Sequence, residues 1–154
     1  MKSLYACMVF FAVASQVSAQ INLRAPLNKG TYRIAGKCIS LTMVGIDVTQ
    51  HCVDLLGVLV QDPAAPMFMF KDSDGTGWLF QTKRAKSIAA DGKSAIYELV
   101  MFHEVGRQQS WKVNGECRLD LRDGIRVECR GKYGRKPGRS GVFESHGTFE
   151  FQRE

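Results

Sequence analysis

The chain repeats one eight-residue pattern, Ser110-Trp111-Lys112-Val113-Asn114-Gly115-Glu116-Cys117, which first appears at residues 31–38 as Thr-Tyr-Arg-Ile-Ala-Gly-Lys-Cys. Both copies read small hydroxyl, aromatic, base, β-branched, any residue, Gly, charge and Cys, without a gap. A second cysteine follows each copy, and each copy later reaches acid-Ser-x-Gly-Thr and then Phe-Gln. The sequence therefore predicts two tandem β repeats. Their predicted bounds are repeat one at 31–81, a connector at 82–109, and repeat two at 110–152.

The hydrophobic pattern indicates an all-β protein. In the first copy Tyr32 and Ile34 alternate with Arg33, which is the period of a half-buried strand. No long segment shows the 3.6-residue period of a helix, and Gly, Pro and Asp turns separate the short apolar runs. This pattern predicts a sandwich or a barrel-like single domain built from both repeats.

The second repeat contains the clearest hairpin. A three-residue loop at 122–124 (Arg-Asp-Gly) suits a hairpin with glycine in the left-handed position. Such a loop places Leu121 opposite Ile125, and the same register places Cys117 opposite Cys129. The sequence predicts a disulfide between these two cysteines.

A second intra-repeat disulfide is predicted between Cys38 and Cys52. Gly45 lies midway between them, so a hairpin turning at Gly45 would set the two cysteines opposite each other, at a distance that suits a disulfide. Zinc binding is disfavoured because the chain has no tight Cys-x-x-Cys pair.

The first 19 residues have the features of a secretory signal peptide. Lys2 precedes a short apolar run at 4–14, and a small-x-small motif ends at Ala19. The apolar run is shorter than the roughly 20 residues that span a bilayer, so no transmembrane segment is expected. The prediction is an exported protein, periplasmic or secreted, with a single mature domain at 20–154. Four cysteines in this domain agree with an oxidising compartment.

The strongest functional feature is a basic stretch near the C-terminus. Five bases and no acid occur between Arg130 and Phe143, within a Gly-rich run that is predicted to be a long exposed loop at 131–141. Such a loop suits an acidic protein or a polyanionic surface, such as lipopolysaccharide or a glycan, although a merely solvated loop is the alternative. Nucleic acid is disfavoured because no aromatic stacking platform is evident. The predicted partner-binding residues are Arg130, Lys132, Tyr133, Arg135, Lys136 and Arg139.

No motif in the sequence carries a catalytic mechanism. The three histidines lack metal-ligand spacing, and no Gly-x-Ser-x-Gly nucleophile motif is present. Residues such as His103, Glu104 and Ser110 can still form a triad, because triads are recognised by geometry. The prediction is nevertheless no catalytic residue, no metal and no cofactor.

Two further segments have structural interpretations. Residues 72–76 (Asp-Ser-Asp-Gly-Thr) resemble half of a calcium loop but lack its later carboxylates, which favours a simple hairpin turn. Residues 67–70 (Met-Phe-Met-Phe) are predicted to form a strand buried on both faces.

Taken together, these features predict an exported, non-enzymatic binding protein. It would act as an inhibitor or immunity-like factor that engages an acidic partner through basic loop 130–141. The alternatives are an envelope or surface protein that contacts anionic lipid or glycan, and a small secreted hydrolase.

Overall fold

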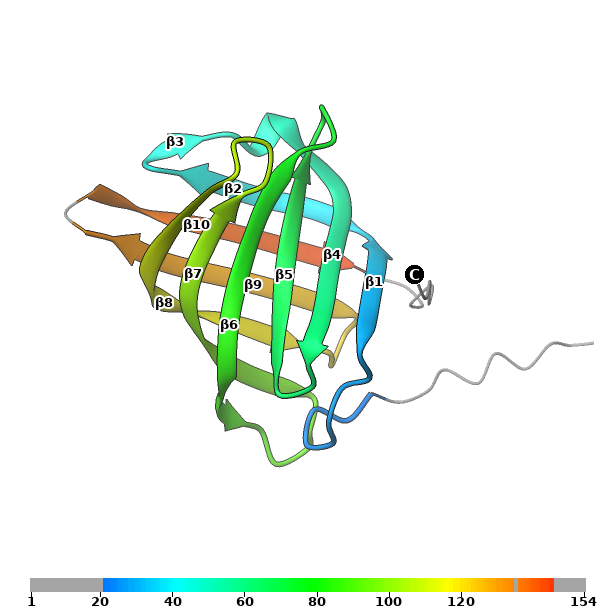
Figure 1. The fold of residues 1–154 in the computed structure, drawn as a ribbon. Coiled ribbons are helices and arrows are strands. Elements are labelled where there is room, and N and C mark those ends of the chain that lie inside the picture. Colours follow the sequence, from blue (N-terminus) through cyan, green and yellow to red (C-terminus); the bar gives the residue numbers. More distant parts are fainter. Residues whose placement is uncertain (1–20, 135, 146–154) are drawn as a thin grey trace, which may run out of the picture.

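The computed structural model describes residues 21–134 and 136–145, which form one curled antiparallel sheet (Figure 1). The signal peptide predicted at 1–19, the predicted site residue Arg135 and the end of repeat two at 146–152 lie outside these residues. The strands and the one short 3-10 helix are β1 (Gly30–Ala35), β2 (Lys37–Met43), β3 (Ile46–Asp47), η1 (Thr49–His51), β4 (Cys52–Asp62), β5 (Ala65–Asp72), β6 (Gly77–Ile88), β7 (Ser94–Glu104), β8 (Gln109–Asp120), β9 (Ile125–Tyr133) and β10 (Lys136–Ser145).

The strand order forces the sheet to curl. The order is β1-β4-β5-β6-β7-β8-β9-β10-β2-β3, so β1 and β2 lie near opposite edges although one residue, Gly36, separates them in the chain. The edges must therefore approach each other, and the sheet forms a half-barrel whose green strands lie in front of the yellow and orange ones (Figure 1). The all-β, barrel-like prediction is confirmed.

The inner face of the sheet is an aromatic core. Phe80 packs edge-to-face against Phe70 and Phe102, with ring centroids 5.3 Å apart in each case. In β5 burial alternates, so Phe68 and Phe70 are buried while Met67 and Met69 lie half-buried on the outer face. The prediction that residues 67–70 are buried on both faces is therefore wrong, because no second layer covers the outside of this sheet in the described residues.

Both predicted disulfides are present. Cys117 and Cys129 lie directly opposite each other in β8 and β9, and Gly124 has a φ of 106°, as the three-residue loop requires. Cys38 and Cys52 are also bonded.

The geometry of the first bridge differs from the prediction. The β2–β3 turn pairs Met43 with Ile46, and β3 is two residues long before η1 begins. This register does not set Cys38 opposite Cys52. Instead the chain continues through η1 into β4, so the bridge joins β2 to β4, two strands that do not pair with each other.

The two copies of the repeated pattern occupy different places in the sheet. Residues 31–38 span β1, Gly36 and the start of β2, whereas residues 110–117 lie within the single strand β8. Residues 82–109, predicted as a connector, belong largely to β6 and β7 in the middle of the sheet. The structure does not directly show a tandem repeat. What the two copies share is that each leads to a disulfide-bonded cysteine, Cys38 at the start of β2 and Cys117 near the end of β8.

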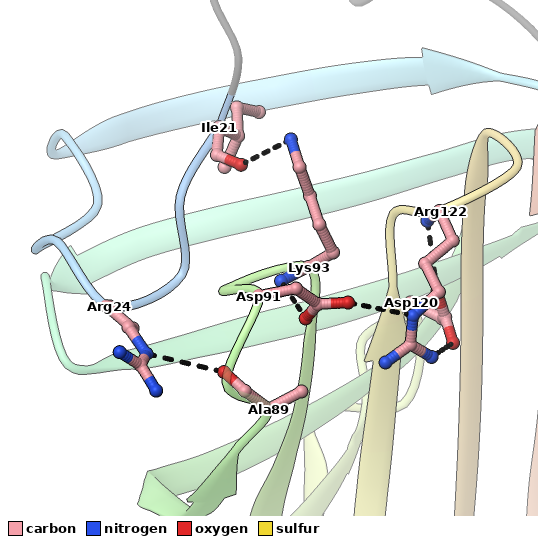
Figure 2. Close-up of polar contacts among 7 residues, drawn as sticks. All are labelled: Ile21, Arg24, Ala89, Asp91, Lys93, Asp120 and Arg122. Atoms are coloured by element: carbon pink, nitrogen blue, oxygen red, sulfur yellow. Dashed lines mark hydrogen bonds and ion pairs between the residues drawn. The ribbon is translucent and has the colours of Figure 1, made fainter.

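Residues 21–29 form a strap across one end of the sheet (blue in Figure 1). Leu23 is 5% exposed, and its backbone N–H donates to the carbonyl of Gly92 over 2.8 Å. Figure 2 shows the polar contacts around this end, which join the strap to the β6–β7 turn and join that turn to the β8–β9 turn. The side-chain contacts are Arg24 Nε to Ala89 O at 3.3 Å, Lys93 Nζ to Ile21 O at 3.4 Å, Arg122 Nε to Asp91 Oδ2 at 3.1 Å and Arg122 Nη1 to Asp120 Oδ2 at 2.9 Å.

Candidate binding site at the β9–β10 hairpin

The basic stretch is a β-hairpin and not a loop. Strand β9 continues to Tyr133, and β10 begins at Lys136, so the prediction of a long exposed loop at 131–141 is wrong. Glycines in this stretch permit close strand packing. A Cβ on Gly138 would lie 2.7 Å from the carbonyl oxygen of Gly131. Glycine is therefore required here because β9 and β10 pack closely, and not because the segment is a flexible loop.

Because side chains alternate across a strand, the hairpin divides the predicted site residues between two faces. Arg130 and Lys132 are exposed on the outer face, whereas Tyr133 is half-buried and Arg139 is buried on the inner face. The backbone of Lys136 starts β10. The structure therefore does not bring the six predicted residues together as one surface.

On the outer face, acids balance most of the bases of β8 and β9. The cross-strand pairs are Glu116 with Arg130, Arg118 with Glu128, and Asp120 with Arg126. Opposite charges facing each other across strands stabilise a sheet, each pair by about 0.2–1 kcal/mol. Glu128 also forms an ion pair with Arg130.

This balance ends near the hairpin tip. Lys132 pairs with Asn114, and Lys112 pairs with Met101 on the neighbouring strand β7. Lys112 and Lys132 are both exposed and are diagonal neighbours, and neither forms an ion pair within the described chain. We call Lys112, Arg130 and Lys132 the outer basic face.

On the inner face, Arg139 lies on an aromatic floor. Its guanidinium carbon lies 4.0 Å from the ring centroid of Phe102 and 4.2 Å from that of Trp111. The ring of Tyr133 contacts Trp111 edge-on with centroids 6.2 Å apart, and lies 5.8 Å from the guanidinium. Arg139 is 6% exposed, and burial lowers its pKa, although Glu104 nearby has the opposite effect.

A second polar group occupies the outer face of β6, β7 and β8. His103 Nδ1 lies 2.6 Å from Ser110 Oγ, and His103 Nε2 lies 2.9 Å from Gln81 Oε1. Because the Gln81 carbonyl can only accept, it favours the Nε2–H tautomer, which leaves Nδ1 to accept from the serine hydroxyl. Partial burial lowers the pKa of His103, so the imidazole is neutral at pH 7.

The group Ser110–His103–Gln81 contains two of the three residues of the triad that the sequence suggested. His103 and Ser110 are brought together, but Glu104 instead forms an ion pair with Arg107 at 3.4 Å. Gln81, which the sequence analysis missed, takes the third place. An open groove of about 450 Å³ adjoins Gln81 on the outside of the sheet. Its lining residues are Gln61, Asp62, Ala65, Met67, Gln81, Thr82, Lys83, Arg84 and Glu98.

The Asp-Ser-Asp-Gly-Thr segment forms the β5–β6 turn. Thr76 Oγ1 donates to Asp72 Oδ2 and to Asp74 Oδ1, each over 2.8 Å, and Gly75 has a φ of 88°. Hydrogen bonds of the Asp74 carboxylate with the Asp72 side chain, and with the backbone and side chain of Thr76, lower the pKa of Asp74. Among the described residues, no group of three or more His, Cys, Asp or Glu side chains is placed to hold a metal ion.

Comparisons with protein-family models, with curated proteins and with solved structures find no match to this chain. The two disulfides indicate an oxidising extracellular environment. Within residues 21–134 and 136–145, no helix is long and apolar enough to cross a membrane. The function is argued below from the sites themselves, because a fold alone does not define one.

Proposed function

We propose that the protein is an exported, non-enzymatic binding protein that engages an acidic partner through the outer basic face of the β9–β10 hairpin. In this role it acts as an inhibitor or immunity-like factor. The observation that carries the proposal is the end of the acid–base pairing along β8 and β9, which leaves Lys112 and Lys132 with no acid directly opposite them near the tip. An acidic surface supplies the charges that the sheet itself does not, and it accelerates association by electrostatic steering.

The test is capture of a partner from the native extracellular or periplasmic fraction by the disulfide-bonded protein. The first variant combines Lys112→Gln and Lys132→Gln. The matched control combines Arg118→Gln and Arg126→Gln, which removes the same charge from bases that face acids on the same two strands. Arg139 is left unchanged in both, because it is buried and its loss would confound binding with folding.

Retention of one protein at high salt by the wild type and the control, but not by the first variant, supports the proposal. Capture that disappears at about 1 M salt, where screening acts within about 3 Å, instead indicates contact with an anionic lipid or glycan surface. Equal capture by the first variant and the wild type would remove the outer basic face from the mechanism.

A second candidate function is a small hydrolase, and the Ser110–His103–Gln81 trio favours it. A neutral imidazole that accepts a hydrogen bond from a serine hydroxyl is the arrangement that activates a nucleophile. Hydrolysis of p-nitrophenyl acetate above the background rate, lost in Ser110→Ala and His103→Gln, would support this function. A wild-type rate equal to that of Ser110→Ala would exclude the trio as a catalytic site for this ester.

A further inference from the structure

Arg139 has hydrogen-bonding capacity that the described chain does not meet. Its Nε and Nη1 atoms are buried, and neither finds an acceptor there. The inward positions beside it on β9 and β8 are glycines, Gly131 and Gly115, which offer no side-chain acceptor. Buried arginines are normally paired with carboxylates, and within the described residues Arg139 makes no ion pair.

The aromatic floor does not compensate for this burial. Stacking of a cation on a ring contributes about 0.5–2 kcal/mol, whereas taking an unpaired ion out of water costs several kcal/mol even after relaxation. Phe102 and Trp111 therefore orient the guanidinium without replacing its lost hydration. A buried group with unmet donors calls for a specific explanation, and an anion bound to the guanidinium is one such explanation.

We propose that Arg139 is an anion-recognition residue, and that a carboxylate binds its in-plane N–H donors on the inner side of the β9–β10 hairpin. The ring centroids of Phe102 and Trp111 lie 4.0 and 4.2 Å from the guanidinium carbon. The N–H donors of a guanidinium lie in its plane, where a planar carboxylate fits.

The charge of the site selects a monoanion. One carboxylate neutralises one guanidinium, whereas a dianion such as phosphate would leave a net negative charge in an apolar interior. Glu104 influences Arg139 electrostatically, but its charge is already balanced by the ion pair with Arg107. This inference does not depend on the outer basic face, which lies on the opposite side of the sheet.

The experiment uses the intact disulfide-bonded protein carrying Trp78→Phe, so that Trp111 is its one tryptophan. Sodium acetate is titrated against sodium chloride at constant ionic strength while Trp111 fluorescence and the Tm are followed. We expect a saturable change in fluorescence and a rise in Tm, because a ligand that binds the folded state stabilises it. Arg139→Met should abolish both responses, and Arg139→Lys should weaken binding at least tenfold because lysine lacks the planar donor set.

The control Arg130→Gln removes an exposed arginine from the same hairpin and should leave the acetate response unchanged. A response that does not saturate, or one that persists unaltered in Arg139→Met, overturns the proposal and leaves Arg139 as a structural element of the core. If Arg139→Met does not fold, NMR of the Arg139 Nε–H in the otherwise unaltered protein decides. A saturable shift with acetate supports the proposal, and no shift overturns it.

A parallel titration distinguishes the source of the carboxylate. A short peptide with blocked termini, in which one internal Glu is the sole charged residue, is compared with acetate. Saturation by both indicates that a side chain of a partner polypeptide reaches Arg139, and saturation by acetate alone indicates a small free carboxylate. Both outcomes require the Arg139 dependence described above, and the absence of a response to either probe overturns the proposal.

Discussion

Cys117 and Cys129 lie directly opposite each other in the β8–β9 hairpin, with their Cα atoms 4.0 Å apart and both residues fully buried. The Cys38–Cys52 bridge has a Cα–Cα distance of 6.1 Å, and Cys52 is half-buried. One bridge thus reinforces two strands that already pair, and the other ties β2 to a strand with which it does not pair.

We expect removal of either bridge to lower the free energy of unfolding by about 3 kcal/mol, because the closed loops of 12 and 14 residues are similar in length. The Cys117→Ala/Cys129→Ala variant should lose more than the Cys38→Ala/Cys52→Ala variant, since deleting two fully buried sulfur atoms also leaves a cavity. Urea unfolding of the two variants measures the difference. Equal losses, or the reverse order, would contradict this reasoning.

Gly115→Ala should weaken the contact between β8 and β9. A Cβ at this position would overlap the carbonyl oxygen of Arg130 and lie 2.5 Å from the Cα of Gly131, and backbone cannot move aside as a flexible side chain does. We expect a loss of about 1–3 kcal/mol in the free energy of unfolding. The control is Gly134→Asn at the hairpin tip, where a Cβ meets nothing within 4 Å and asparagine tolerates the φ of 51°. A loss for Gly134→Asn as large as that for Gly115→Ala would show that steric overlap is not the cause.

The end of the sheet that the strap covers is expected to depend on the apolar contact of Leu23 more than on the ion pairs of Arg122. Leu23→Ala removes a buried side chain and should cost about 2–4 kcal/mol of unfolding free energy. Arg122→Gln removes two ion pairs at the same end of the sheet. Arg122 and Asp91 are exposed and Asp120 is partly exposed, so the change should fall within experimental error. Thermal unfolding of both variants provides the measurement, and a larger effect of Arg122→Gln would refute the ranking.

His103 should make stability fall as the pH drops through and below about 6.5. Burial lowers the pKa of the folded imidazole, whereas the unfolded chain has the ordinary value of about 6.5. Above pH 6.5 both states are neutral and the contribution of His103 is fully present. As the pH falls through 6.5 the unfolded chain binds a proton first, so the free energy of unfolding decreases.

His103→Gln removes this titration and should give a shallower pH dependence than the wild type over that range. Urea midpoints at several pH values test the expectation. An NMR titration midpoint for His103 at or above 6.5 would show that the direction is wrong.

The sequence predicted those parts of the fold that depend on local pattern. The Arg-Asp-Gly loop and the leucines and cysteines that flank it gave the register of β8 and β9, because turn length and alternation determine which residues face each other. The first bridge was also predicted, although its hairpin register was not, since a two-residue turn at Val44 and Gly45 is equally compatible with the sequence.

The candidate site was less predictable because it depends on which face each residue occupies. A run of glycines and bases suggested a loop, yet these glycines permit close strand packing, and alternation places Arg139 inward. One signal was present in the sequence. Alternation from the cysteine at 129 places Gly131 and Tyr133 on the inner face. The aromatic surroundings of Arg139, however, come from Trp111 and Phe102 on other strands, which local pattern does not reveal. Gln81 was missed for the same reason, since its contact with His103 crosses from β6 to β7.

The placement of β1 and β2 near opposite edges of the sheet also has a consequence for the order of folding. Strands β4 to β9 each pair with the next strand in the chain, so these pairings can form locally, one hairpin after another. The pairing of β2 with β10, in contrast, joins Thr42 to Ser140, so it cannot form until nearly the whole chain has been synthesised. Until then β2 and the growing end of the sheet present unpaired edges that attract other chains. A chain truncated before β10 should therefore aggregate, even though both of its disulfides can form.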